Sequence, residues 1–310
     1  MIDGMGVGSR LQFVPTEPVV APVDAKTAND SRPPRWRWIV FGVVAGALFV
    51  AERLRPLRAR KEPGASRVGR NLTIGLLAGA TTAASEFPVI APVQALAERR
   101  RLGLLRRLPL PRALRVALGF LLLDYTLYLW HWLNHRSPWL WRFHAVHHID
   151  LDLDSTTGVR FHFGELTQAA FFRAAQVLLI GVDRETLRIW QQLLVCSVVF
   201  HHSNLELPIE VERRLAILLV TPRIHGIHHS TRADETDSNY SSLLSLWDRL
   251  HSSLRLDVPQ AAVTIGVPGF STPEDVSLTA SLSLPFLQDP RLQPPAAAAL
   301  RRRSGEADAS

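Results

Sequence analysis

Long apolar stretches alternate with short basic segments along the chain. The first apolar run, residues 39–51, spans about 20 Å as an α-helix, which is less than the bilayer's hydrocarbon core of about 30 Å. The second run, residues 71–97, is interrupted by Glu86, Pro88 and Pro92. This second pattern leaves two interpretations open: a bent hairpin that returns to the same side, or a single crossing.

Three later apolar runs are typical of membrane helices. Residues 113–130 are the strongest candidate, and they lead directly into His131. Residues 166–180 and 187–200 are separated by a short turn that begins at Gly181, which predicts a helical hairpin. Because a hairpin returns the chain to the side it left, the polar segments before and after it are expected to lie together.

Basic segments, together with the apolar runs, divide the chain into predicted parts. Seven basic residues lie within residues 53–70 and seven more within residues 99–115. Basic loops favour the cytoplasmic side, yet both flank the second apolar run, so the topology before residue 113 stays open. These patterns predict four parts: a flexible arm at residues 1–35, membrane segments and basic loops at 36–112, a central helical domain at 113–256, and an extension at 257–310, largely disordered from about residue 288.

The composition narrows the class of protein. Hydrophobic residues make up 47% of the 310 residues and charged residues only 20%, whereas soluble domains carry about 25% charged residues. Cys196 is the only cysteine, which excludes a disulfide scaffold. The net charge of +7 on so apolar a chain predicts anionic lipid headgroups as partners rather than nucleic acid.

Histidine is confined to one region, because all twelve histidines lie between His131 and His251. His131 and His135 are four residues apart, so a helix presents both on one face. Asp124 and Tyr128 precede them on that face, and Asp124 is expected to accept the second ring N–H of a ligating histidine. The alternative for this pair is a polar helix end at the membrane interface.

Two histidine triplets share one spacing. The triplets are His144, His147 and His148, and then His225, His228 and His229. Helical residues at i, i+3 and i+4 lie near one another, so each triplet is expected to present three nitrogens to one cavity. By composition alone, one such triplet is expected in about 2% of chains of this length, which disfavours two unrelated polar helix ends.

Nine imidazoles are predicted metal ligands: His131, His135, His144, His147, His148, His202, His225, His228 and His229. A tetrahedral zinc site needs only four ligands, so nine favour two metal ions. Ligand type alone does not choose among iron, zinc, copper and nickel. Further ligands, or groups that orient the ligands, are predicted at His162, His201, Asp124, Tyr128, Glu165, Asp150, Asn204 and Asn239. His251 is interpreted as structural, and a solvated interfacial histidine is the alternative for His162 and His201.

The order of these motifs resembles the fatty acid hydroxylase/sterol desaturase superfamily, and most closely its bacterial sterol desaturase-like members. The resemblance runs from about residue 71 to residue 251. It rests on Asp124-Tyr125-x-x-Tyr128-x-x-His131, on Trp141-Arg142-Phe143-His144-x-x-His147-His148-x-Asp150, on Thr221-Pro222-Arg223-x-His225-x-x-His228-His229-Ser230, and on the phrases Asp237-Ser238-Asn239-Tyr240 and Leu246-Trp247-Asp248-Arg249-Leu250.

The resemblance implies an all-α integral membrane helical bundle with a histidine-rich metal-binding cap at the membrane interface. Its implied activity is that of an oxidoreductase, in which the nine histidines hold two iron ions. This di-metal centre, itself the catalytic group, uses O2 as co-substrate to hydroxylate or desaturate an unactivated C–H bond of a lipid. The implied catalytic domain is residues 113–256.

The same resemblance implies a location and partners. We expect a multi-pass protein of the inner or cytoplasmic membrane, with the active site on the cytoplasmic side. No cytochrome or flavin domain is evident, so a separate reductase, ferredoxin or cytochrome is expected to supply electrons. The chain departs from the family pattern at Phe163, where proline is frequent, and at His251-Ser252-Ser253, where Phe-Gly-Thr is frequent. Neither departure changes a predicted ligand, and both bear on the substrate entrance.

Two alternative functions stay open. A pair of zinc ions with a bridging hydroxide would define a membrane hydrolase, although hydrolytic sites usually include carboxylate ligands. A non-catalytic metal carrier would place ionisable residues through the depth of several helices. Here the histidines gather at helix ends, which favours one fixed site.

Overall fold

A computed structural model describes residues 35–62 and 64–295. The chain divides into two compact units, residues 1–42 and 43–310. Residues 1–34 of the predicted arm and residues 296–310 of the predicted disordered tail lie outside the described residues. Helix α2 (Arg35–Leu54) begins in the first unit and ends in the second.

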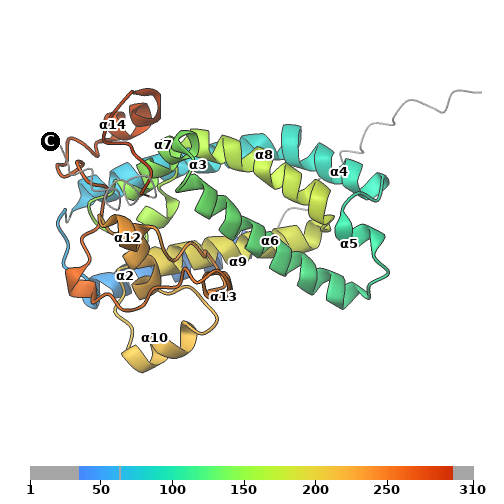
Figure 1. Cartoon of the computed structure of the whole chain (residues 1–310), viewed down its shortest axis with the longest axis horizontal. Helices are drawn as coiled ribbons and strands as arrows, with labels where there is room; N and C mark the ends of the chain where they lie inside the picture. The colour runs from blue at the N-terminus through green and yellow to red at the C-terminus, as the bar shows by residue number, and fades with distance from the viewer. Residues whose placement is uncertain (1–34, 63, 296–310) are drawn as a thin grey trace, which may run out of the picture. The chain divides into compact units, whose positions relative to one another are not determined.

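The second unit is built from helices, which confirms the predicted all-α class. Within the described residues there is no strand longer than an isolated β-bridge. Helix α3 packs beside α8, and α6 packs beside α9 (Figure 1). The helical elements are α3 (Ala65–Ser85), η1 (Glu86–Ile90), α4 (Ala91–Arg99), α5 (Leu104–Arg107), α6 (Arg112–Asn134), α7 (Pro138–His148), η2 (Thr157–Val159), α8 (Phe163–Ile180), α9 (Arg184–His202), α10 (Ile209–Leu215), α11 (Pro222–His228), α12 (Ala233–Thr236), α13 (Leu246–Leu250), η3 (Gln260–Ala262), α14 (Leu278–Ser283) and η4 (Leu284–Phe286).

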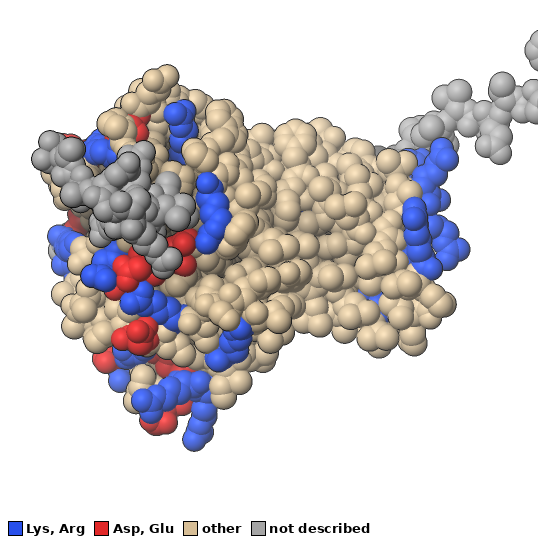
Figure 2. All heavy atoms as spheres, viewed as in Figure 1, with Lys and Arg blue, Asp and Glu red and all other residues tan. Residues whose placement is uncertain are grey.

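Two helical segments are long and apolar enough to cross a membrane, Ala65–Arg107 and Arg112–Asn134. Leu76 and Leu179 are about three-quarters exposed, as is expected of side chains that face lipid. On the face drawn in Figure 2, a belt largely free of charged side chains lies between a mixed acidic and basic end and a group of basic side chains beyond it. This arrangement indicates a membrane protein.

The second apolar run follows a continuous helical path, so the hairpin interpretation does not hold. Helix α3 passes through one π-helical turn, η1, directly into α4. Pro88 lies in that turn and has no N–H to donate to the helical ladder, and such an interruption is commonly absorbed by a wider turn. The prolines therefore do not reverse the path.

Helices α8 and α9 follow the predicted path, because a short turn joins them, but each packs mainly against other helices, α6 among them, rather than against the other. Helix α8 ends at Gly181, which has a left-handed φ of 79°. Gly103 lies against this turn, and a Cβ on Gly103 would stand 2.3 Å from the Gly181 Cα atom. Only glycine fits here, so the turn is held against the segment before α5. The Asp183 carboxylate then caps α9 by accepting the Thr186 N–H at 2.8 Å.

Two apolar clusters pack different parts of the helical unit. One cluster joins α4, α6, α8 and α9 and includes Leu123, Val177 and Trp190. The other packs Val146 of α7 against the C-terminal segment, in which Leu292 is buried. The described part of the C-terminal extension therefore covers the outer side of α7.

Candidate metal centre

The nine predicted ligands converge in two buried groups. The first group is His131, His135, His144, His148 and His228, and the second is His147, His202, His225 and His229. Within each group, one ring nitrogen from every histidine lies within 4.8 Å of the others. The first group draws on α6, α7 and α11, and the second on α7, α9 and the end of α11.

Each triplet is divided between the two groups, which corrects the expectation that a triplet serves one cavity. In α7, His144 and His148 belong to the first group and His147 to the second. In α11 the assignment is reversed, because His225 and His229 belong to the second group and His228 to the first. The helical step of about 100° per residue explains this division, since it separates adjacent side chains more than those four apart.

The spacing of the nitrogens suits metal coordination. In the first group, the Nε2 atom of His131 lies 3.1 Å from that of His144 and 3.0 Å from that of His228. In the second group, His202 lies at 2.9 Å from His147 and 3.0 Å from His225, again between Nε2 atoms. Two imidazoles bound at about 2.1 Å and a right angle would be separated by about 3.0 Å, so the donors already stand at coordination distance.

Four of the nine ligands have an acceptor on the other ring nitrogen. Nδ1 lies 2.6 Å from the Tyr240 carbonyl in His131, 2.8 Å from Glu165 in His144, 2.7 Å from Val198 O in His202 and 2.7 Å from Ser238 O in His228. A carbonyl only accepts, so Nδ1 carries the proton and the Nε2 lone pair faces the centre. Glu165 is thus placed as a group that orients a ligand.

Burial keeps five of the imidazoles neutral. It lowers the pKa of His228 to about 3 and holds the pKa values of His147, His148, His225 and His229 well below the ordinary value. Neutral imidazole is the form that binds metal. Both ring nitrogens of His135 are buried without a hydrogen-bond partner, which is costly unless an ion occupies the space between the ligands. The donor set therefore fits two ions of the kind that imidazole prefers.

Asp124 does not contact a ligating histidine, contrary to the expectation. Its carboxylate accepts the Trp247 indole N–H at 2.7 Å and the Leu244 N–H at 3.2 Å. Seven residues separate Asp124 from His131, about 10 Å along a helix, which is too far for the side chain to reach the ring. Tyr128 likewise bonds to the Ser253 hydroxyl, at 2.9 Å, and not to a ligand.

Asp150 stabilises the loop after α7 and is not a ligand. It accepts hydrogen bonds from Arg67 Nη2 and Asn71 Nδ2, both at 2.8 Å. Burial alone would raise the pKa of Asp150, but the charges of Arg67 and Arg160 and these hydrogen bonds lower it to about 2. Arg160, which the sequence analysis missed, is fully buried and donates from Nε to the Val146 carbonyl at 2.9 Å. The sequence could have indicated this arginine through the closely spaced aspartates after α7, because such acids need cations nearby when they are buried.

The other predicted groups lie around the centre without joining either group. His162 caps α8, since its Nδ1 accepts the Gly164 N–H at 2.9 Å. Asn204 binds the Arg58 backbone, and Asn239 binds the Ile224 and Arg255 carbonyls. His201 is buried, and its ring lies 4.1 Å from that of His225 between centroids. It is therefore a neighbour of the second group.

The fold and the site together define an all-α protein with membrane-type helices and two adjacent, buried, all-imidazole groups that form a candidate metal centre. Comparison with known proteins gives the particular family. Residues 116–253 match the model of the fatty acid hydroxylase family, described as "Fatty acid hydroxylase". This match and the curated relatives support the assignment of residues 116–253 to the fatty acid hydroxylase/sterol desaturase superfamily.

Curated relatives agree with this assignment. An ornithine lipid hydroxylase of Rhizobium tropici is 29% identical over 160 residues, covering 51% of this chain and 47% of the relative. A cholesterol 25-hydroxylase-like protein of Danio rerio is 31% identical over 157 residues, covering 47% and 59%. An alkylglycerol monooxygenase of Danio rerio is 29% identical over 133 residues, covering 43% and 29%. The chain spans about half the length of the first two relatives. No solved structure matches the chain.

Proposed function

We propose that the protein is a membrane-bound di-iron oxidoreductase that uses O2 to hydroxylate or desaturate an unactivated C–H bond of a lipid. The observation that carries the proposal is the pair of adjacent, buried, all-imidazole groups. The His148 and His229 rings, one from each group, stack with centroids 4.2 Å apart. The relatives named above are hydroxylases and monooxygenases, which supports the same reaction class.

The nine histidines of the two groups are the proposed iron ligands. Two iron ions held there would supply the strong oxidant that an aliphatic C–H bond requires, since such chemistry belongs to the cofactor. The chain's own residues prepare the site. Burial lowers the pKa of ligands such as His228, the Nδ1 acceptors aim Nε2 of four ligands inward, and the surrounding helices exclude water from a reactive centre.

The wider organisation follows from this activity. We propose residues 113–256 as the catalytic domain and residues 36–112 as membrane segments and basic loops. The protein would be multi-pass in an inner or cytoplasmic membrane, with the centre on the cytoplasmic side. There a separate reductase, ferredoxin or cytochrome would supply electrons. The lipids named in the relatives, ornithine lipid, cholesterol and alkylglycerol, share one polar end and a long apolar body.

The test is oxygen-isotope incorporation. Iron-loaded protein in lipid nanodiscs is given a chemical reductant, a broad lipid extract and ¹⁸O2. We expect lipid products that carry ¹⁸O or a new double bond, absent under argon and absent with His147→Ala or His228→Ala. Products that form without O2 and take oxygen from H2¹⁸O would instead indicate a metal-dependent hydrolase. Absence of any product over the whole extract would contradict the proposed function.

A further inference from the structure

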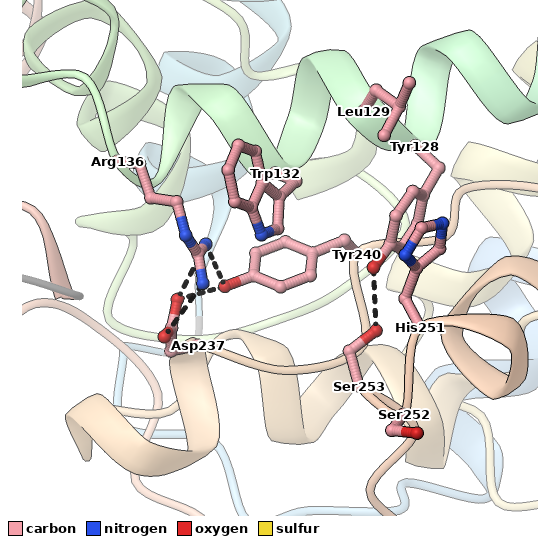
Figure 3. A pocket seen from close by; sticks show the side chains of 9 residues that line it. All are labelled: Tyr128, Leu129, Trp132, Arg136, Asp237, Tyr240, His251, Ser252 and Ser253. Atoms are coloured by element: carbon pink, nitrogen blue, oxygen red, sulfur yellow. Dashed lines mark hydrogen bonds and ion pairs between the residues drawn. The ribbon is translucent and has the colours of Figure 1, made fainter.

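A pocket of about 420 Å³ lies between the end of α6 and the segments around Tyr240 and Ser253 (Figure 3). Leu129 and Trp132 form its apolar wall at the end of α6, and both are more than a third exposed. Arg136 and Asp237 form its polar wall. The residues His251, Ser252 and Ser253, where the sequence departs from the family pattern, complete the lining. The pocket is thus amphipathic, with one side continuous with an apolar helix face.

The Tyr240 ring separates this pocket from the histidines. The ring lines the pocket, and its centroid lies 5.8 Å from that of His131, 5.3 Å from His135 and 5.5 Å from His228. The Tyr240 hydroxyl bonds to Asp237 and accepts from Arg136 Nη1 at 3.0 Å (Figure 3). A molecule held in the pocket is therefore one aromatic ring away from the first group.

The polar wall has unused donors but few unused acceptors. Both carboxylate oxygens of Asp237 are within hydrogen-bond distance of donors, Oδ1 of the Tyr240 hydroxyl and Oδ2 of Arg136 Nη2 at 3.3 Å. The Arg136 Nε has no acceptor among the described residues, and the side chain is 29% exposed. The Arg136 guanidinium also lies 4.2 Å from the centroid of the Trp132 ring, which holds it over the apolar wall. Such a wall favours an incoming anion over an incoming cation.

We propose that this pocket binds the anionic polar end, a carboxylate or phosphate, of a membrane amphiphile. Arg136 donates to the anionic oxygens, since the guanidinium fork matches both groups. Asp237 pairs with the same guanidinium and competes with an incoming anion for it. The apolar chain lies along Leu129 and Trp132 and continues onto Leu121, two turns earlier on the exposed face of α6. The amphiphile reaches the pocket from the bilayer without passing through water.

This inference rests on the proposed function in one respect, namely that the bound amphiphile is the substrate. Binding itself is independent of turnover, so it is measured without O2 or reductant. The probes are four twelve-carbon amphiphiles brominated within the first few carbons beside the polar end, namely dodecanoate, dodecyl phosphate, dodecanol and dodecyltrimethylammonium. Each is titrated into protein in phosphatidylcholine nanodiscs. The readout is the fluorescence quenching that Trp132→Phe abolishes.

We expect the two anionic probes to bind about tenfold more tightly than the neutral and cationic probes, as charge-assisted hydrogen bonds predict. Arg136→Gln should remove this preference. Its matched control is Arg213→Gln, which removes an exposed arginine of α10 outside the pocket and should retain the preference. Asp237→Asn should tighten anion binding, because it releases the guanidinium from its carboxylate. Millimolar inorganic phosphate should not compete, which distinguishes a lipid end from a free ion.

Equal binding of all four probes, or an anion preference that survives Arg136→Gln, would overturn the inference. If Arg136→Gln does not fold, Asp237→Asn decides, because unchanged or weaker anion binding in that variant is equally contradictory. Anion binding that depends on Arg136 without any oxidised product would leave this site standing and remove the proposed function. Oxidised product without Arg136-dependent anion binding would leave the proposed function standing and remove this binding site.

Discussion

The two histidine groups are alike in chemistry and different in support. In the first group, three of five ligands have an Nδ1 acceptor, provided by Tyr240, Glu165 and Ser238. In the second, only His202 has one, from Val198. The first group also borders the amphipathic pocket through the Tyr240 ring. Hydrogen bonds therefore orient more of the imidazoles in the group that borders the pocket, where a lipid would bind. The imidazoles of the second group depend mainly on the helices that carry them for their position.

Removing one histidine ligand from either group should cause the largest loss of activity. The size of the loss should differ between the two groups. We expect His148→Ala and His229→Ala to lower O2-dependent product formation by more than about 100-fold, since even outer partners of ligands typically contribute 10–100-fold. His229→Ala should be the more severe, because it leaves three imidazoles where His148→Ala leaves four. The measurement is product per protein at equal iron supply. Activity above one-tenth of wild type in either variant would contradict a role for that group.

The support behind α7 is tested by Arg67→Met. Arg67 is buried and donates to Asp150 and Asp154 at 2.8 and 2.6 Å. Removing the cation takes its charge and its hydrogen bonds from two buried carboxylates, which should lower the free energy of unfolding by about 3–5 kcal/mol. Chemical unfolding in detergent measures this loss. The control Arg213→Met, at an exposed pair, should change it by less than about 0.5 kcal/mol. A similar small change for both variants would show that the network is not structural.

Glu165→Gln sharpens the contrast between the groups. The substitution keeps the size of the side chain and weakens the acceptor on His144 Nδ1. We expect iron affinity to fall by about 10–100-fold at one of two sites, with the other site unchanged. Competition with a chelator, followed as iron retained per chain, gives the two affinities. Equal weakening of both sites would mean that Glu165 does not act through the first group.

Tyr240→Phe should have the smallest effect. It removes the hydroxyl that bonds to Arg136 and Asp237, but it keeps the carbonyl that orients His131. We expect a loss of about 1 kcal/mol in the free energy of unfolding, the usual contribution of one hydrogen bond, with iron content unchanged. Parallel unfolding and iron analysis test this. Loss of iron in this variant would show that the hydroxyl, and not the backbone, supports the first group.

The helices and the set of nine histidines were predictable, because both depend on local periodicity. A spacing of three and four residues places side chains near one another on any helix, whatever surrounds it. The division of each triplet between two groups depends on where α7 and α11 face one another. The sequence pattern does not contain that information.

The partners of buried polar groups were not predictable, because they come from distant parts of the chain. Asp124 contacts Trp247 and not a histidine, and Arg160 reaches the Val146 carbonyl and the Ser281 hydroxyl. Similarly, the continuous path from α3 to α4 depends on a π-helical turn that accommodates Pro88. The family resemblance was confirmed by the domain match over residues 116–253, whereas the ligand roles stay predictions.

The most direct test of the account is the number of metal ions per chain. Gently extracted wild-type protein, His228→Ala and His229→Ala are compared by elemental analysis after the same iron supply. The two groups predict about two iron ions in the wild type and about one in each variant, since each variant disrupts one group. A wild type with a single ion, or variants that both retain two, would contradict the claim that each group holds its own ion.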